Sequence, residues 1–254
     1  MSGERGSPLK RQRLDERVVA DELAPTRSQA RGLILAGRVL VDDVPVDKCG
    51  APVALEARVR VRGDERRFVS RGGEKLAGAL EDLGLDPAGR SCLDLGASTG
   101  GFTDCLLQAG AIGVTAVDVG YGQLDFRLRN DPRVRVLEQT NARLLDAELL
   151  PDPIDLVVID VSFISVTLLL PVLAQRVPSA EVLVMVKPQF ELERGRVGKG
   201  GVVRDDADRY DAVERVVQAA RGLGYAEHGR ADSRLTGPKG NREIFVRLKP
   251  PAEA

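Results

Sequence analysis

A glycine-rich segment directly after a short apolar run is where residue types first suggest binding chemistry. Residues 93–102 read LDLGASTGGF. A dinucleotide-binding loop would carry glycine where Ser98 stands, and a nucleoside triphosphate loop would carry Gly-Lys-Ser or Gly-Lys-Thr, which this segment lacks. Asp94, Gly96 and Gly100 instead provide an acid and two glycines that allow close backbone approach without a phosphate cradle. This spacing predicts a loop that binds S-adenosylmethionine.

A second acid follows at a suitable distance. Asp118 stands 22 positions after Gly96, at the end of the next apolar run. An acid at this place in a doubly wound sheet accepts hydrogen bonds from the ribose hydroxyls of a nucleotide. Asn141, after the third run, is a candidate contact for the adenine. The predicted cofactor site comprises Asp94, Gly96, Ala97, Ser98, Thr99, Gly100, Gly101, Phe102, Asp118, Val119 and Asn141.

Charged residues at other strand ends indicate the methyl acceptor. Residues 160–163 read DVSF, whereas enzymes that methylate base amino groups carry Asn/Asp-Pro-Pro-aromatic there, and attack on a pyrimidine carbon needs a cysteine nucleophile. Lys187 closes the fifth apolar run and Glu243 opens the last, while Lys75 lies on a preceding helix. Together with Asp160, this Lys-Asp-Lys-Glu set favours a ribose oxygen as acceptor.

The chemistry expected of this set is removal of a hydroxyl proton. A ribose 2'-hydroxyl is a poor nucleophile until its proton leaves, so in-line positioning and proton removal are what the protein must supply. Lys187 is expected to deprotonate or polarise the hydroxyl, Asp160 and Glu243 to orient it, and Lys75 to hold the acceptor oxygen or a phosphate. Whether Lys187 acts as a base or as a charged donor to the developing oxyanion stays open.

Alternating elements must position these residues. Helices are predicted over residues 74–83 and 205–222, with strands at residues 91–95, 114–119, 134–139, 156–161, 182–187, 226–235 and 243–248. Compact apolar runs separated by crossovers indicate a parallel sheet covered on both faces, whereas the short connection at residues 236–241 permits only an antiparallel hairpin. We therefore expect an α/β, Rossmann-like methyltransferase sheet with an antiparallel terminal strand.

The N-terminal segment predicts a separate, small α+β unit. Apolar residues at helical spacing precede a second helix that begins after Thr26, where Thr26 and Gln29 form a capping box, and ends at Gly37. Short strands are expected at residues 39–41 and 59–61. The residues expected on a helix face are Leu14, Val18, Val19 and Leu23, and those on a basic side are Arg13, Arg27, Arg31, Arg38 and Lys48.

Composition limits the other possibilities. Residues 1–69 hold 14 Lys and Arg against 11 Asp and Glu, so the small unit is the basic part of a chain whose net charge is −1. Aromatic residues make up only 4%, which favours recognition of RNA shape and phosphates by this unit over base stacking. Three cysteines without CxxC spacing and one histidine argue against a disulfide scaffold or zinc site. Neither a membrane span nor a secretory signal is visible, so we expect a cytoplasmic protein. We also expect a monomer that binds no metal.

The residues also carry a resemblance. The N-terminal segment resembles the αL RNA-binding domain of ribosomal small-subunit protein four, although that family has Asn-Gly where this chain has Asp42-Asp43, which leaves the turn type open. Six further motifs resemble the TlyA family, often labelled hemolysin A. They are VSRGGEKL (69–76), GASTGGFT (96–103), DVGYGQL (118–124), VSFIS (161–165), VKPQFE (186–191) and GNRE (240–243).

The resemblance implies a cytidine 2'-O-methyltransferase acting on ribosomal RNA or a ribosomal subunit, with an RNA-binding domain at residues 1–68, including a basic tail, and an FtsJ-like domain at residues 69–254. Its catalytic positions match Lys75, Asp160, Lys187 and Glu243, and its RNA contacts match Arg13, Arg27, Lys48 and Arg143. Because members acting on both subunits have a longer C-terminal tail, and this chain ends eleven residues after Glu243 (254 − 243), large-subunit RNA is the favoured substrate.

Two other classes of function compete with this one. A pore-forming hemolysin would need an amphipathic or apolar membrane segment. A non-catalytic ribosome assembly factor would retain the fold without needing the four charged residues or the complete glycine loop.

Overall fold

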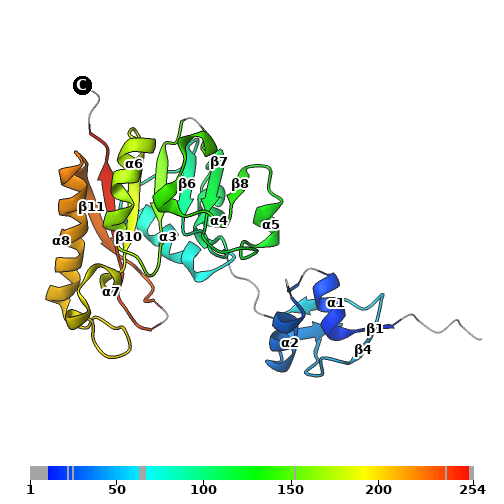
Figure 1. Ribbon diagram of the computed structural model, residues 1–254. Helices are drawn as coiled ribbons and strands as arrows, with labels where there is room; N and C mark the ends of the chain where they lie inside the picture. Colours follow the sequence, from blue (N-terminus) through cyan, green and yellow to red (C-terminus); the bar gives the residue numbers. More distant parts are fainter. Residues whose placement is uncertain are drawn as a thin grey trace, which may run out of the picture. The chain divides into compact units, whose positions relative to one another are not determined.

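The protein consists of two compact units, residues 1–66 and 67–254 (Figure 1). The computed structural model describes residues 11–21, 23–24, 26–62, 67–151, 153–237 and 239–251, apart from the side chain of Ala147. The expected basic tail before residue 11 therefore lies outside the described residues. The domain boundary expected between residues 68 and 69 stays a prediction.

The N-terminal unit packs two short helices against small sheets. Strand β1 pairs with β4, and β2 lies between β3 and β5, all antiparallel. Leu14, Val18 and Ile34 are buried in its core, with Val19 and Leu23 packed against them as the helical spacing predicts. The elements are β1 (Arg11–Arg13), α1 (Leu14–Ala20), α2 (Arg27–Leu35), β2 (Val39–Val41), β3 (Val44–Pro45), β4 (Pro52–Ala54) and β5 (Val59–Val61).

Both ends of α2 are capped, with one difference from the expected capping box. The Gln29 amide donates to Thr26 Oγ1 at 3.3 Å, as predicted. The side chain of Gln29 instead accepts a hydrogen bond from the Thr26 hydroxyl. At the other end Gly37 has a φ of +66°, and the Arg38 amide donates to the Leu33 carbonyl at 3.0 Å, which closes the helix in a Schellman-like turn.

The turn left open by the sequence is a two-residue hairpin. Val41 pairs with Val44, and the intervening Asp42 and Asp43 have φ values of +48° and +66°. Two left-handed residues between paired strands make a type I′ turn, the type that Asn-Gly favours. Aspartate tolerates this conformation better than most side chains, so the Asp-Asp sequence retains the turn at some cost in strain.

The second unit is built on a seven-stranded sheet whose order is β11-β12-β10-β9-β6-β7-β8. Strands β8, β7, β6, β9 and β10 are parallel, and β12 runs antiparallel to both β10 and β11. The expected hairpin is confirmed. The strands are β6 (Ser91–Leu95), β7 (Gly113–Val117), β8 (Val134–Leu137), β9 (Leu156–Ile159), β10 (Glu181–Val186), β11 (Ala226–Asp232) and β12 (Ile244–Lys249).

Helices cover both faces of this sheet (Figure 1). Alternate residues of one strand enter different cores: Val182 and Val184 pack with α6 and α8, whereas Leu183 and Met185 pack with α3 and α4. Burial on both faces explains why β9 is apolar throughout and why β10 is apolar after Glu181. The helices are α3 (Arg71–Asp82), α4 (Gly101–Gln108), α5 (Phe126–Arg129), α6 (Leu170–Arg176), α7 (Pro188–Glu191) and α8 (Asp206–Gly222), with short 3₁₀ turns η1 (Ala142–Leu144), η2 (Ala147–Leu149), η3 (Val166–Leu168) and η4 (Arg194–Arg196).

Several parallel strands end earlier than predicted. Strands β7, β8 and β9 each stop two residues before the expected end. The polar residues that follow leave the ladder, as when the Thr140 amide donates to the carbonyl of Asp118 and Gln139 takes a φ of +53°. Asp118, Asp160 and Lys187 therefore stand just beyond their strands, where the chain turns and side chains converge.

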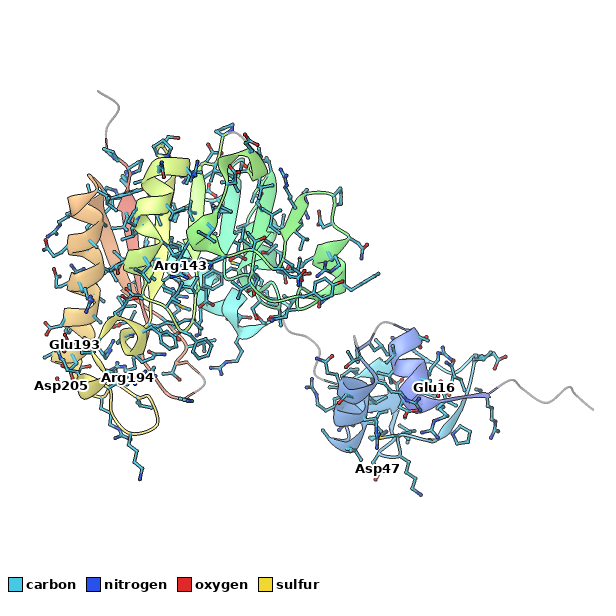
Figure 2. All side chains as sticks on the ribbon, viewed as in Figure 1. Glu16, Asp47, Arg143, Glu193, Arg194 and Asp205 are labelled. Carbon is cyan, nitrogen blue, oxygen red and sulfur yellow. The ribbon has the colours of Figure 1, made fainter. Side chains whose placement is uncertain are left out.

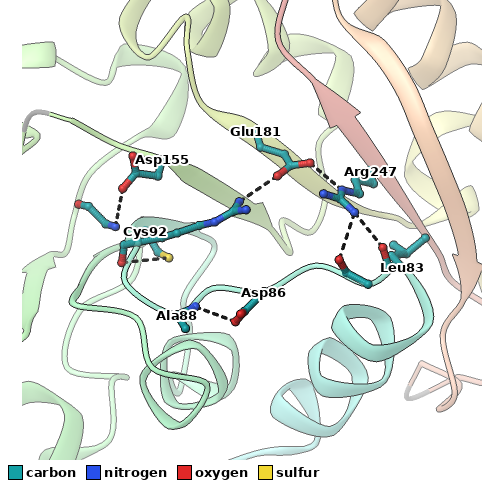
Figure 3. Close-up of polar contacts among 10 residues, drawn as sticks. Leu83, Asp86, Ala88, Cys92, Asp155, Glu181 and Arg247 are labelled. Atoms are coloured by element: carbon teal, nitrogen blue, oxygen red, sulfur yellow. Dashed lines mark hydrogen bonds and ion pairs between the residues drawn. The ribbon is translucent and has the colours of Figure 1, made fainter.

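At the opposite, amino-terminal edge of the sheet, charged side chains form ion pairs and hydrogen bonds with one another (Figure 3). Glu181 pairs with Arg90 at 2.9 Å and with Arg247 at 2.6 Å, and these arginines hold the carboxyl pKa below its usual range despite partial burial. Arg247 also donates to the carbonyl of Leu83 at 2.8 Å. These groups bond to one another, whereas the carboxyl edge carries the predicted site.

Candidate active site

The glycine loop follows β6 and is shaped by positive backbone angles. Gly96 has a φ of +87°, and a Cβ on it would lie 2.6 Å from the carbonyl oxygen of Asp160. Gly100 has a φ of +95°, and its missing Cβ leaves room for Leu128. Gly96 thus permits direct contact between the predicted cofactor loop and the residue that follows β9.

Two other members of the predicted loop turn into the protein. A Cβ on Gly101 would lie 2.8 Å from the Gly73 amide nitrogen, so this glycine lets α4 approach the start of α3. Phe102 is buried and stacks on Phe245 with ring centroids 6.1 Å apart. The Phe102 side chain is therefore a core residue, and only its backbone is available to a ligand of the loop.

Asp94 is a fully buried carboxylate at the end of β6. Thr103 donates a hydrogen bond of 2.6 Å to Asp94 Oδ2, while Oδ1 has no hydrogen-bond partner among the described residues. Burial, reinforced by the charges of Asp160 and Asp118, raises the Asp94 pKa to about 7. A buried acid with an unused oxygen beside a glycine loop fits a cofactor that carries positive charge, as S-adenosylmethionine does.

The Asp118 carboxylate accepts hydrogen bonds from the backbone of two loops. Its two oxygens accept hydrogen bonds from the amides of Ser98 at 2.8 Å and Gly120 at 2.7 Å, which leaves each oxygen with further acceptor capacity. The next residue, Val119, is 71% exposed and offers an apolar surface beside the acid. Asn141 caps η1 by accepting from the Arg143 amide at 3.0 Å.

The four predicted catalytic residues form two ion pairs. Lys187 Nζ lies 2.5 Å from Asp160 Oδ1, and Lys75 forms a buried ion pair with Glu243. Burial raises the Asp160 pKa, against the opposing charges of Lys187 and Lys75 and with the help of Glu243. The other three residues therefore all lie within electrostatic reach of Asp160. Adjacent strands explain this convergence, because β9, β10 and β12 are neighbours whose relevant ends meet at one edge.

Three residues beside this set were missed by the sequence analysis. Lys187 Nζ donates to Ser162 Oγ at 2.8 Å. Phe163 is 88% exposed, has a φ of +71° and packs on Phe190 with ring centroids 5.4 Å apart. The motifs VSFIS and VKPQFE contain all three, but nothing in a linear sequence indicates a left-handed phenylalanine.

Cysteine chemistry is not supported at this site. Burial raises the pKa of both Cys92 and Cys105 to about 12, so neither thiol is a ready nucleophile. Among the described residues no group of three or more His, Cys, Asp or Glu side chains is arranged to hold a metal ion.

Two of the basic residues of the N-terminal unit donate hydrogen bonds to a buried acid. The buried Asp15 accepts from Arg13 at 3.1 Å and Arg27 at 3.0 Å, and these arginines lower its pKa. Arg31 and Lys48 are exposed. In the larger unit, Arg143 is exposed as well and is labelled in Figure 2.

The loop over residues 194–201 is anchored near the ion pairs. Asn241 is buried, accepts from the Val203 amide at 2.9 Å and donates to the Gly201 carbonyl at 2.8 Å. Arg196 connects this loop to α8 by ion pairs with Asp208 and Asp211. Because Asn241 is two residues from Glu243, one turn holds both the loop and an acid of the site.

The sheet order, the reversed terminal strand and the glycine loop define a methyltransferase of the Rossmann-like class. Comparisons with known proteins agree: residues 68–249 match the model of the FtsJ-like methyltransferases, and residues 12–59 match the S4 domain. The chain belongs to the TlyA family of FtsJ-like methyltransferases.

Individual relatives span most of the chain. It is 49% identical over 244 residues to the 16S/23S rRNA (cytidine-2'-O)-methyltransferase TlyA of Mycobacterium tuberculosis, covering 94% of this chain and 90% of the relative. A solved structure of a candidate hemolysin from Streptococcus thermophilus is 37% identical, with a TM-score of 0.72 over 96% of this chain and 90% of the other. The N-methyltransferase NodS from Bradyrhizobium japonicum shares the fold alone, at 15% identity and a TM-score of 0.51 over 72% of this chain and 98% of the other.

Proposed function

We propose that this chain transfers a methyl group from S-adenosylmethionine to the ribose 2'-oxygen of a cytidine in ribosomal RNA. The observation that carries the proposal is the convergence of Lys75, Asp160, Lys187 and Glu243 beside a glycine loop that touches Asp160. The name of the M. tuberculosis relative supplies the nucleotide, the 2'-oxygen and the kind of RNA. We propose that the reaction takes place in the cytoplasm, where ribosomal RNA is found.

The proposed cofactor contacts come from the ends of β6, β7 and β8. Bound S-adenosylmethionine supplies a methyl group already activated by a sulfonium. Asp94 would offset the cofactor's positive charge, Asp118 would accept from its ribose hydroxyls, and Val119 and Asn141 would contact its adenine. The backbone of the loop from Gly96 to Phe102 would lie against the remaining part of the S-adenosylmethionine molecule.

The acceptor hydroxyl is proposed to meet Lys187. This residue takes the hydroxyl proton or donates to the oxygen as negative charge develops there. Asp160 orients Lys187, to which it is paired, and Lys75 with Glu243 holds the ribose or its phosphate. The exposed Phe163, packed on Phe190, offers an aromatic face on which the target base can stack.

The RNA itself is proposed to bind the S4 domain through Arg13, Arg27, Arg31 and Lys48, with Arg143 contacting phosphate from the methyltransferase unit. Arginines held by Asp15 present oriented donors to phosphate oxygens.

Of the two competing functions, pore formation has the weaker support. No helix among the described residues is both long and apolar enough to cross a membrane. A non-catalytic assembly factor would have no need of two ion pairs assembled at a cofactor loop.

The proposal is tested by incubating the protein with labelled S-adenosylmethionine and separated ribosomal subunits, then mapping methylated nucleotides by reverse-transcription stops. We favour large-subunit RNA as the substrate. Both subunits belong in the assay, because the relative's name includes 16S and 23S RNA. Failure to label either subunit would refute the proposed function.

Replacement of the central lysine separates binding from chemistry. Lys187→Ala should keep the affinity for S-adenosylmethionine and abolish transfer, because Lys187 is assigned to the acceptor oxygen. Unchanged turnover would remove Lys187 from the mechanism.

A further inference from the structure

The hydroxyl of Ser162 contacts the central lysine of the site. Lys187 Nζ donates to Ser162 Oγ at 2.8 Å while it lies 2.5 Å from Asp160 Oδ1. Other serines near this edge have a different role: Ser70 and Ser165 cap α3 and η3 through backbone amides. Ser162 is exposed, so its contact with Lys187 contributes little to the core.

The segment that carries Ser162 is tied to the segment that carries Lys187. Phe163 packs on Phe190, and the buried Glu191 accepts from the Ser165 hydroxyl at 2.5 Å and from the Val166 amide at 2.8 Å. These contacts flank the hydrogen bond between Ser162 and Lys187. They also hold Phe163 at a φ of +71°, a conformation that costs a bulky side chain of the order of 1–3 kcal/mol.

This arrangement has a consequence for the geometry of Nζ. The nitrogen has four tetrahedral valences: one is the bond to Cε and one is directed at Ser162, while Asp160 Oδ1 lies 2.5 Å away as an ion-pair partner without hydrogen-bond geometry. Both remaining valences carry protons in the ammonium form, and one of them is a lone pair in the neutral amine. The hydrogen bond to Ser162 fixes the rotation about the Cε–Nζ bond and therefore sets the directions of these two valences in either protonation state.

We propose that Ser162 is a positioning residue that directs a remaining valence of Lys187 Nζ toward the acceptor hydroxyl, while Asp160 holds the lysine by its charge. This inference rests on the proposed function and adds a residue to its site. It applies equally if Lys187 accepts the hydroxyl proton through its lone pair or donates a proton to the developing oxyanion. Without Ser162 the hydrogens or lone pair on Nζ can turn away from the acceptor, and the lysine side chain loses a contact that restrains the position of Nζ. A misplacement of about 1 Å at a reacting group costs roughly a hundredfold in rate.

The experiment compares Ser162→Ala and Ser162→Thr with wild type in steady-state methylation of the ribosomal subunit that the wild type labels. Ser162→Ala should lower kcat by roughly ten- to a hundredfold, with KM for RNA and the affinity for S-adenosylmethionine unchanged within about twofold. Ser162→Thr retains the hydroxyl and should recover most of the lost kcat. Ser179→Ala, an exposed serine before β10 at the opposite edge of the sheet, is the matched control and should behave as wild type.

The outcomes separate the two proposals. If wild type transfers methyl groups and Ser162→Ala keeps kcat within twofold, the positioning role is wrong while the proposed function stands. A Ser162→Ala variant that loses cofactor affinity and thermal stability together would make the residue structural and would also overturn the role. A low kcat in both variants, without rescue by threonine, would also overturn the positioning role. If wild type labels neither subunit, both proposals fail.

Discussion

At the scale of single residues, the site contains acids whose burial disfavours the charged form. Asp94 is buried beside two other acids, and its pKa rises to about 7, while burial also raises the pKa of Asp160 despite its pairing with Lys187. An acid buried in this way weakens the folded protein when it ionises. We infer that Asp94 is retained for its interaction with a positively charged ligand at the cost of stability.

Asp94→Asn tests this trade-off. The folded-state pKa of about 7 exceeds the ordinary value of 3.8, so the folded protein binds this proton more tightly and loses stability as pH rises from about 4 to 7. The loss amounts to roughly 4 kcal/mol at most, from about 1.4 kcal/mol per pH unit. Without cofactor, Asp94→Asn should unfold at higher temperature than wild type at pH 8, with no advantage at pH 4, and should bind S-adenosylmethionine more weakly.

Thermal unfolding from pH 4 to 8, together with calorimetric titration of the cofactor, measures both effects. The exposed Asp47→Asn serves as the control, with no pH-dependent difference expected. A variant less stable than wild type at pH 8 would contradict the assignment of Asp94 as a destabilising charge.

At the scale of elements, close backbone approach joins the proposed cofactor loop to the proposed acceptor site. The Asp160 amide donates to the Leu95 carbonyl at 2.9 Å, and Gly96 lies against the Asp160 carbonyl. Strands β6 and β9 thereby bring the two halves of the site together at their carboxyl ends.

Gly96→Ala should disrupt this junction. The new Cβ would meet the Asp160 carbonyl at 2.6 Å, and the φ of +87° is unfavourable for alanine. We expect a decrease of about 2–4 kcal/mol in the free energy of unfolding and at least a tenfold loss of cofactor affinity. Gly122→Ala isolates the backbone effect, because Gly122 has a φ of +67° but no atom within 4 Å of the added Cβ. Equal losses in denaturant titrations of both variants would show that the contact with Asp160 is unimportant.

The I′ turn of the N-terminal unit offers a stabilising change. Asp43→Gly removes a left-handed side chain at φ +66° and should stabilise the β2–β3 hairpin by about 0.5–1 kcal/mol. The lost ion pair with Arg60 is exposed and contributes little. The Val46 amide donates to the Val39 carbonyl, so slower hydrogen exchange of this amide would indicate that the hairpin is more stable. Faster exchange would indicate that the aspartate contacts outweigh the strain.

At the scale of the whole molecule, each unit has a hydrophobic core of its own. The core around Leu14 and Ile34 belongs to the N-terminal unit, while the cores on the two faces of the seven-stranded sheet belong to the larger one. Two independent cores indicate that cofactor binding and RNA binding can be separated.

A fragment of residues 67–254 should therefore fold cooperatively and bind S-adenosylmethionine with an affinity within about threefold of the full chain. Its affinity for ribosomal RNA should fall at least tenfold, with a shallower dependence on salt, because the cations of the S4 domain are removed. Calorimetry with the cofactor and filter binding at several salt concentrations provide the comparison. An unfolded fragment, or one with full RNA affinity, would contradict this division.

Much of this protein was predictable from the sequence because the signals are local. Apolar periodicity identified the strands, and the short connection before Glu243 indicated a hairpin. The spacing of Asp94, Gly96 and Gly100 likewise predicts the cofactor loop, which stays a prediction. Each of these depends on neighbours within a few residues, so the linear chain contains it directly.

The tertiary structure decided which distant side chains meet. Lys75 and Glu243 are 168 positions apart, and Lys187 reaches Ser162 across 25 positions, so sheet order and register rather than spacing bring them together. The exposure of Phe163 and its left-handed backbone also depend on contacts that local propensity opposes. The residue types of the site are thus readable from the sequence, but the partners of each residue follow only from the packing of strands and loops.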